Sequence, residues 1–355
     1  MKAFLIAAAL AFASLGSAGA AEAIATISFA DGLVSVSRDG SKLEKSGIGD
    51  DIYDGDLIST GSVGAVTLQL GKATGMSGSI KVASKTSFYF NIKSIKGENR
   101  GQAELIAGQI SLKMKKLAGS PTFDVDAENA TCAVRGTEFD VIASPGGSIL
   151  VACAEGEVEC ASEGVSTSAV PGQAVEKREG VRIARRTVAA ADYENFKRKW
   201  IEGEAAAFKR DAPKAARRIA ANYLDLAQRL AANQERISAS GAVKAWVEEE
   251  RKGGAGVAIS KAELDRRLAE AEPLLKESRL ILGTMERVAA RVTAIKEAID
   301  DDPTVLSQEI RPGRTVGDFF SRFEAARDRD LQRIAALRRT VRLVERARSE
   351  RERIK

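Results

Sequence analysis

The sequence predicts an all-β N-terminal domain, built as a twisted solenoid or a sandwich of short strands, followed by an all-α domain that forms a coiled coil or a helical bundle. Two patterns predict this order. From about residue 27 to residue 180, apolar and polar residues alternate with a period of two, in short runs separated by turn residues. After residue 187 the period becomes helical and glycine becomes sparse. We therefore expect the β domain at residues 21–186 and the helical domain at residues 187–355.

The N-terminal runs are strand candidates because each has one apolar and one polar face. They are GLVSVSR, GAVTLQL, GSIKVAS, TSFYFNI, GQISLKMK, TFDVDA, EFDVIAS, ILVACAE and EVECAS. They recur about every 8 to 14 residues, and no helical pattern separates them. This spacing argues against helical crossovers and a parallel Rossmann-type sheet, and favours an all-β sandwich, roll or solenoid.

Three long amphipathic runs follow in the second half of the chain. The first contains Pro213, which should kink or divide it. The second opens with Ser260, three residues before Glu263, which is the spacing of a capping box. The joints GGAG and DDPTVLSQEIRPG are short enough for an antiparallel bundle or a coiled-coil hairpin. Length alone leaves open whether the apolar stripes pack within one chain or form a homo-oligomer through the helical region.

The apolar stripes of the first and third runs have helical spacing. Their members are Tyr193, Phe196, Trp200, Phe208, Ile219, Tyr223, Leu226 and Leu230 in the first run, and Phe319, Phe323, Leu331, Ile334, Leu337, Val341 and Val344 in the third.

Residues 1–20 have the pattern of a secretory signal peptide. They carry one lysine, an apolar run and the small-residue sequence Ala18-Gly19-Ala20, so cleavage is expected after Ala20. No cysteine follows the run, which gives no lipoprotein anchor. An uncleaved N-terminal anchor is the alternative. We expect a periplasmic or secreted protein with no transmembrane helix after the leader.

The composition excludes several classes of chemistry. No histidine occurs in the chain, which removes the commonest general base, the commonest zinc ligand and the usual pH switch. We expect no catalytic, metal-binding or cofactor-binding residues and no enzymatic activity. The acidic turn GDDIYDGD, with Asp50, Asp51, Asp54 and Asp56, is interpreted as a solvated turn. Calcium binding is the alternative, although the turn lacks the closing glutamate of an EF-hand loop.

Cys132, Cys153 and Cys160 are candidates for one disulfide bond. Export would place them in an oxidising compartment. Cys153 and Cys160 flank the turn-like AEGE and could face each other across a hairpin, while Cys132 lies on a neighbouring strand and competes for either. The sequence leaves the two ends of the bridge open. A redox-active pair is the weaker interpretation, because no Cys-x-x-Cys spacing occurs.

Charge divides the chain into two parts. Residues 181–355 hold 38 Lys and Arg against 28 Asp and Glu, whereas the residues before them hold 16 against 21, so the tail is net +10 and the front net −5. Export makes nucleic acid the least suited partner. Arginines alternate with glutamates at helical spacing, which favours a solvent-exposed bundle face. An anionic surface, an acidic polymer or the acidic front of a second copy are the alternatives.

Two motifs in the strand region, GDLISTG and CAVRGTEFDV, are interpreted as structural corners. Their glycines suit a positive φ or a close strand approach, and their threonine hydroxyls can satisfy loose backbone groups. The residues concerned are Gly55, Asp56, Thr60, Gly61, Val134, Arg135, Gly136, Thr137 and Phe139.

Arg135 is the residue of the second motif with the widest choice of partners. Its fork can donate to several carbonyls or pair with a carboxylate such as Asp56 or Glu138, a geometry that lysine could not reproduce. Asp56 can also accept from turn amides, and Val134 and Phe139 should point to the core. A ligand contact at Arg135 is the alternative, since loops often carry binding residues.

Residues 27–185 resemble the FecR domain of bacterial exported proteins. The segments that carry the resemblance are GLVSVSRDG, DGDLISTGSVGAVTLQLG, GSIKVASKTSFYFN, GQISLKM, FDVDAENATCAVRGTEFDV, AEGEVECAS and VPGQAVEKREG, in that order. The resemblance implies an all-β, twisted solenoid-like fold and a non-catalytic role in envelope signalling or scaffolding. The best-known members control a sigma factor across a membrane. This chain has a signal peptide where their cytoplasmic segment and transmembrane helix would be, so that activity does not carry over.

These observations predict a non-enzymatic exported protein whose FecR-like domain mediates protein–protein interaction, scaffolding or signalling in the bacterial cell envelope. The expected partner is an envelope protein, and the helices would space or oligomerise the domain. The alternative is a periplasmic module that binds peptidoglycan or another polysaccharide on an exposed strand face. No cofactor and no nucleic acid are expected.

Overall fold

The computed structural model describes residues 22–38, 41–43, 46–71, 74, 76–95, 98–115, 123–128, 130–134, 138–252 and 260–353. The predicted leader at residues 1–20 lies outside these residues, and so do Arg135, Gly136 and Thr137 of the second motif.

The described strands of the N-terminal part form two sheets that share one long strand, β9 (Glu98–Met114). Residues 98–107 of β9 pair with β8, and residues 108–113 pair with β12 of the other sheet. Gly108 lies at this change of sheet with φ +99°, and a Cβ there would collide with Thr86. Only glycine fits such a corner, because it combines a positive φ with a close approach.

The first sheet has the strand order β4-β1-β6-β7-β9-β12-β13-β16-β17. Besides β9 it consists of β1 (Ala25–Asp31), β4 (Asp51–Ile52), β6 (Ala65–Leu70), β7 (Gly78–Val82), β12 (Glu138–Ala143), β13 (Ile149–Glu155), β16 (Gln173–Lys177) and β17 (Ala184–Thr187).

The second sheet has the strand order β3-β2-β5-β8-β9-β10-β11-β14-β15. Besides β9 it consists of β2 (Val34–Arg38), β3 (Ser41–Lys42), β5 (Asp56–Thr60), β8 (Ser87–Ile95), β10 (Phe123–Ala127), β11 (Ala130–Val134), β14 (Val158–Ser162) and β15 (Val165–Ala169).

The all-β prediction is confirmed for this part of the chain, but the solenoid alternative is not supported. Neighbouring strands in both sheets run antiparallel, and among the described pairs only β9 and β10 are parallel. Successive coils of a solenoid would stack alike, whereas here the chain returns through hairpins and passes from one sheet to the other. The apolar faces of the two sheets meet in a single core, as in a sandwich.

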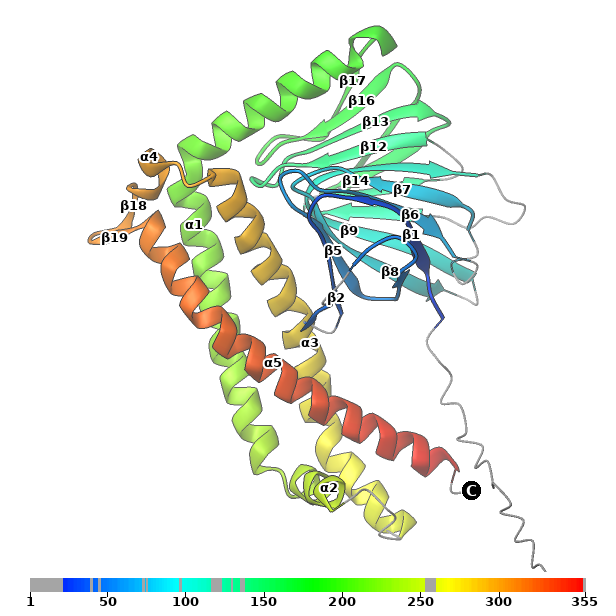
Figure 1. Cartoon of the computed structure of the whole chain (residues 1–355), viewed down its shortest axis with the longest axis vertical. Helices are drawn as coiled ribbons and strands as arrows, with labels where there is room; N and C mark the ends of the chain where they lie inside the picture. Colours follow the sequence, from blue (N-terminus) through cyan, green and yellow to red (C-terminus); the bar gives the residue numbers. More distant parts are fainter. Residues whose placement is uncertain are drawn as a thin grey trace, which may run out of the picture.

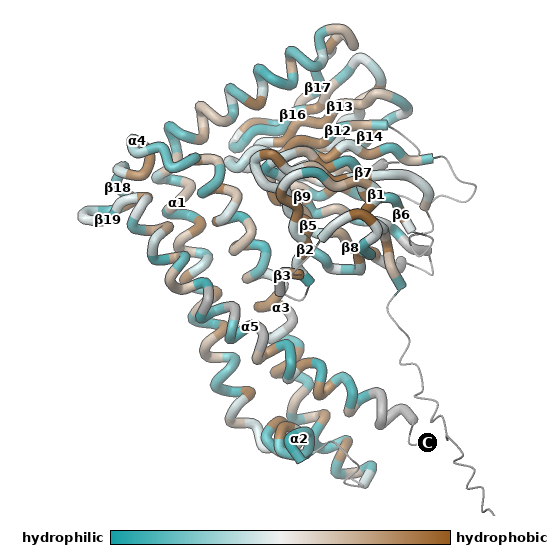
Figure 2. The backbone as a smooth tube through the Cα atoms, viewed as in Figure 1, coloured by the Kyte–Doolittle hydropathy of each residue, from teal (hydrophilic) through white to brown (hydrophobic). Residues whose placement is uncertain are grey.

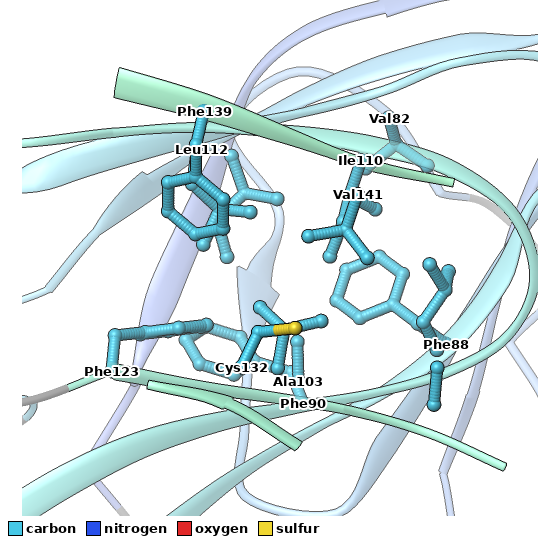
Figure 3. Packing of buried hydrophobic residues seen from close by; sticks show 14 of the residues in the cluster. Val82, Phe88, Phe90, Ala103, Ile110, Leu112, Phe123, Cys132, Phe139 and Val141 are labelled. Atoms are coloured by element: carbon cyan, nitrogen blue, oxygen red, sulfur yellow. The ribbon is translucent and has the colours of Figure 1, made fainter. Parts of the chain in front are cut away.

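The core between the sheets explains the period of two in the sequence. Strand β5 alternates buried and half-buried residues throughout, so one face enters the core and the other does not. Figure 3 shows Leu112 and Phe139 from the first sheet opposite Phe90 and Phe123 from the second. Phe90 and Phe123 have ring centroids 5.9 Å apart. Burying such aromatic side chains contributes about 1.5–3 kcal/mol each.

The rest of the described chain is helical apart from one short hairpin, as the sequence predicted for the helices (Figure 1). The elements are η2 (Ala190–Asp192), α1 (Tyr193–Ala239), α2 (Gly241–Arg251), α3 (Lys261–Ile299), α4 (Pro303–Leu306), the hairpin β18 (Glu309–Arg311) and β19 (Arg314–Thr315), and α5 (Val316–Arg353). No described helix is both long enough and apolar enough to span a bilayer.

Helices α1, α3 and α5 bury their apolar stripes against one another within a single chain. Leu230 of α1, Leu275 of α3 and Leu337 of α5 belong to one buried cluster. Figure 2 shows hydrophobic and hydrophilic residues alternating along these helices. The Ser260 hydroxyl accepts from the Glu263 amide at 3.3 Å, so α3 begins at the predicted cap. The arrangement is a helical bundle, and a coiled coil is not shown.

Helix α1 has two parts with different partners. Pro213 lies inside the helix, and α1 changes direction along its length (Figure 1). Beyond this proline, residues such as Ile219 join the bundle core. Before it, Trp200 packs on the outer face of the first sheet, against Leu150 and Ala174, and is 4% exposed. The first apolar residues of the helix therefore hold the bundle to the β domain.

The joint between α3 and α5 is more ordered than a loop. Asp302 caps the four-residue helix α4 by accepting from the Thr304 amide at 3.0 Å. The hairpin β18–β19 follows, and its turn contains Gly313 at φ +68°. The sequence did not predict these elements, because each is too short to show a period.

Candidate functional site

The GDLISTG motif places a buried carboxylate at the start of β5. Asp56 is fully buried and accepts from Arg38 Nε and Nη2, both at 2.8 Å, and from the Tyr53 amide at 2.9 Å. In the antiparallel ladder of β2 and β5, Val36 pairs with Ile58, which brings Arg38 at the end of β2 level with Asp56. The two-pronged ion pair joins the strands and satisfies the charge in the interior.

The other residues of this motif form a tight corner. Gly55 has φ +85° with open space around it, so its conformation is what requires glycine. A Cβ at Gly61 would lie 2.9 Å from Leu33 Cβ, so that glycine permits a close approach. The Thr60 hydroxyl donates to the Ala83 carbonyl at 2.6 Å and accepts from the Thr86 amide at 3.1 Å. The motif therefore connects the turn before β5, the turn after β5 and the turn between β7 and β8.

The second motif is only partly described. Phe139 is buried in the core, and the backbone of Val134 ends β11 opposite Phe123 and Val158. Arg135 lies outside the described residues, so its role stays a prediction. The carboxylates suggested as its partners already bond other cations: Asp56 holds Arg38, and Glu138 accepts from Lys113 Nζ at 2.7 Å.

Arg38 is not among the residues that the sequence predicted for this corner. A detectable signal existed, because an arginine at the end of one strand and an aspartate at the start of the next paired strand are brought level by a hairpin-like register. The acidic turn between them contains several carboxylates, and the sequence does not indicate which of these carboxylates is buried.

The carboxylates of the acidic turn do not converge on a common point. Asp50 accepts from the Gly47 amide at 2.7 Å, Asp51 from the Thr26 hydroxyl at 3.0 Å, and Asp54 from the Ile92 amide at 2.7 Å. Among the described residues, no group of three or more acidic or cysteine side chains is placed to hold a metal ion. The calcium alternative therefore has no geometric support.

The three cysteines are free thiols in this structure and occupy two different settings. Cys132 and Cys160 are directly opposite on β11 and β14, and their sulfurs are 2.7 Å apart in the core. The hydrogen bond with Cys160, and then burial, raise the pKa of Cys132. Cys153 lies on the other sheet and donates to the Glu155 carbonyl at 3.3 Å. The pairing suggested between Cys153 and Cys160 would have to cross the core.

A polar groove of about 890 Å3 crosses the outer face of the second sheet. We call it the acidic groove, because its described lining carries five carboxylates and one cation. These charged residues are Asp54, Glu104, Asp126, Glu128, Glu163 and Arg287. Neutral polar groups, among them Asn91, Gln102 and Thr131, complete the lining. The groove is thus suited to a cationic or strongly hydrogen-bonding ligand.

One row of side chains across the sheet builds the floor of this groove. Glu104 of β9 lies directly beside Asp126 of β10, which in turn lies opposite Thr131 of β11. Two like charges at adjacent positions of a sheet destabilise it. The Gln102 amide donates to Asp126, and Arg287 Nε donates to Glu104 at 2.7 Å, which offsets part of that repulsion.

Helix α3 borders the acidic groove: its Arg287 lines the groove, and its Arg291 contacts a carboxylate of the lining. Arg287 contacts Glu104, and one turn later Arg291 pairs with Glu128 and donates to the Pro145 carbonyl at 3.2 Å. Burial lowers the pKa of Arg291, and the charge of Glu128 opposes this effect. The helical part therefore contributes directly to the groove. This groove could not be predicted from the sequence, because its residues come from distant segments.

The family comparison follows from this architecture. Residues 56–159 match the family model described as "FecR protein", a segment that begins at Asp56 and ends on β14. The chain therefore contains a FecR domain. The wider extent expected from the sequence, residues 27–185, remains an expectation, although strands of the same two sheets continue on both sides of the match.

Two solved structures are weakly similar to this chain. Two crystal structures of "a putative anti-sigma factor from Parabacteroides distasonis ATCC 8503" align with 39% and 40% of this chain, at 14% and 13% identity and TM-scores of 0.32 and 0.26. The chain covers 63% and 59% of their lengths, which is less than two thirds. These likenesses are too weak to carry an argument. No curated protein matches the sequence.

Replacing Asp56 should destabilise the β domain strongly. Asp56→Ala leaves Arg38 and the Tyr53 amide without their acceptor, which we expect to cost about 2–4 kcal/mol of unfolding free energy. Urea denaturation followed by circular dichroism measures this. Glu138→Gln is the matched control, because its pair with Lys113 is exposed and should contribute little. Equal stability of Asp56→Ala and the wild type would contradict the structural role.

If one disulfide forms on export, we expect it to join Cys132 to Cys160 and leave Cys153 reduced. The two opposed sulfurs already touch, whereas Cys153 has no cysteine beside it on its own sheet. Alkylation of the denatured, non-reduced protein followed by peptide mass spectrometry should find a single labelled cysteine, Cys153. A bridge that includes Cys153 would contradict the structure, and three labelled thiols would exclude the disulfide.

Proposed function

We propose that this chain is a non-enzymatic signalling or scaffolding protein of the bacterial cell envelope, and that its FecR domain binds a protein partner through the acidic groove. The FecR match supports a regulatory role. The pattern of residues 1–20 supports export and hence a periplasmic or secreted location. The proposal assigns the groove to a basic segment of the partner, since oppositely charged surfaces select each other.

The observation that carries this proposal is the direct neighbourhood of Glu104 and Asp126 on adjacent strands. A sheet built for stability alone would avoid this juxtaposition, because like charges side by side cost free energy. Such local costs are retained where they serve binding. A lysine or arginine side chain from a partner would relieve the repulsion and form charge-assisted hydrogen bonds in the groove.

The chemistry of the described side chains supports binding over catalysis. The acids of the groove are engaged by amides and cations: Asp126 accepts from the Gln102 amide, Glu104 from Arg287 and Asp54 from the Ile92 amide. Cys132 and Cys160 are buried in the core, away from this surface. The groove is therefore arranged to recognise a shape and a charge.

Polysaccharide binding is the less favoured alternative. Asn91, Gln102 and Thr131 could hydrogen-bond sugar hydroxyls. None of the described residues that line the groove is aromatic, so apolar sugar faces would find no ring to stack on. Oligomerisation through the helices is not part of the proposal, because their apolar stripes face one another within one chain.

Site-specific photo-crosslinking of the full chain in cells of its native host tests this proposal. A photoreactive residue at Thr131, inside the groove, should capture a protein, whereas the same residue at Gln69, exposed on the other sheet, should not. Asp126→Asn should reduce the Thr131 adduct several-fold, since it removes one groove charge at constant shape. Glu159→Gln, an exposed acid on the same sheet outside the groove, is the matched control.

Three outcomes of this experiment would count against the proposal. Equal adducts at Thr131 and Gln69, or an adduct that survives Asp126→Asn, would contradict binding through the groove. An adduct of cell-wall polymer in place of protein would favour the polysaccharide alternative.

A further inference from the structure

A second cavity lies in the helical part, far along the chain from the FecR domain. It is lined by α1, the β18–β19 hairpin and the start of α5, and its volume is about 330 Å3. We call it the hairpin pocket. Figure 1 shows the hairpin beside α1 and the first turns of α5, on the side of the bundle away from the β domain. Cavities of this size hold small organic ligands.

The inner surface of the hairpin pocket is apolar. Phe319 and Phe323 of α5 line it with ring centroids 6.4 Å apart, and Tyr223 of α1 meets Phe323 edge to face at 4.9 Å. The Tyr223 hydroxyl donates to the buried Asp330 at 2.6 Å, so its polar end is already satisfied. Leu224 lines the same pocket and is 61% exposed. An apolar ligand would cover this exposed leucine.

The rim of the hairpin pocket is cationic. Arg217 of α1, Arg311 and Arg314 of the hairpin, and Arg322 of α5 all line it. Within the part of the chain that the structure describes, none of the four forms an ion pair within 4.0 Å or a side-chain hydrogen bond, whereas the neighbouring Arg218 bonds Glu179. Asp318 is the acid of the lining, and it accepts from the Thr315 amide at 2.9 Å, which caps the start of α5.

Several other arginines of the bundle are paired with acids. Arg267 pairs with Glu249 at 2.8 Å, Arg338 pairs with Glu286, and Arg291 pairs with Glu128. At the hairpin pocket, four arginines and a single acid, Asp318, surround an apolar cavity, so the described lining has an excess of positive charge.

We propose that the hairpin pocket binds a single-chain anionic amphiphile, such as a medium-chain fatty acid. The chain of the ligand would lie against the phenylalanines and Leu224, and its carboxylate would meet the arginine rim. Guanidinium groups bind carboxylates through two parallel hydrogen bonds. Charge complementarity and the small volume argue for one chain and one anionic group. This inference does not depend on the acidic groove and goes beyond the proposed function.

Calorimetric titration of the full chain with octanoate, decanoate, acetate and 1-octanol tests the proposal. Each added methylene should tighten carboxylate binding about fourfold, which corresponds to burial of one CH2 group. Acetate, which has the charge without the chain, should not bind. The neutral 1-octanol should bind at least tenfold more weakly than octanoate, because it lacks the charge-assisted hydrogen bonds.

Variants distinguish the contribution of the arginine rim to binding from that of the apolar cavity. Arg314→Gln with Arg322→Gln should weaken octanoate about tenfold and leave 1-octanol unchanged. Leu224→Ser should weaken both ligands. Arg339→Gln removes an exposed arginine farther along α5 and should change neither. Circular dichroism confirms that each variant remains folded.

Three results would overturn the proposal. The first is no heat of binding for decanoate up to millimolar concentration. The second is octanoate affinity that is unchanged when Arg314 and Arg322 are replaced. The third is binding to vesicles of anionic phospholipid with no binding of free carboxylates, which would assign the arginines to a membrane surface.

Discussion

The docking of the helical bundle on the β domain is the constraint on which the functional surfaces depend. Trp200 packs on Ile142, Leu150, Ala152 and Ala174 of the first sheet, and its indole N–H finds no partner among the described residues, so the contact is apolar. At the other sheet, burial removes water from the Arg291 guanidinium, and the ion pair with Glu128 compensates for this loss of hydration. One contact is apolar and the other is ionic. Together they hold the bundle in the position in which α3 borders the acidic groove.

The sequence predicted the types of elements well and their partners poorly. A period of two marks which side chains of a strand face a core, and a helical period marks a stripe, because both follow from backbone geometry. Neither period says what covers the buried face. The helical spacing therefore predicts that Tyr193, Phe196 and Trp200 face the bundle, whereas they pack on the first sheet. Strands β12 and β13 bury residues on both faces. For the same reason, their sequences do not predict that a helix covers the outer face.

The functional surfaces could be predicted even less. Gly55 is required for its own backbone conformation, so a motif of seven letters is enough to suggest its role, whereas Thr60 and Gly61 contact Ala83 and Leu33 from other segments. Glu104 and Asp126 become neighbours only because β9 and β10 pair in parallel with one register. The hairpin pocket likewise requires a two-stranded element too short for any periodic signal. Surfaces that depend on strand register and tertiary contacts cannot be predicted from patterns along the chain.

Small-angle X-ray scattering of the full chain tests the central claim, that Trp200 and Arg291 hold the two parts in one arrangement. The wild type should scatter as a single body with the shape of Figure 1. Trp200→Ala combined with Arg291→Gln should increase the radius of gyration, while Ile201→Ala, an exposed neighbour of Trp200, should not. An unchanged radius in the double variant, or a wild type that scatters as two freely moving bodies, would contradict the account.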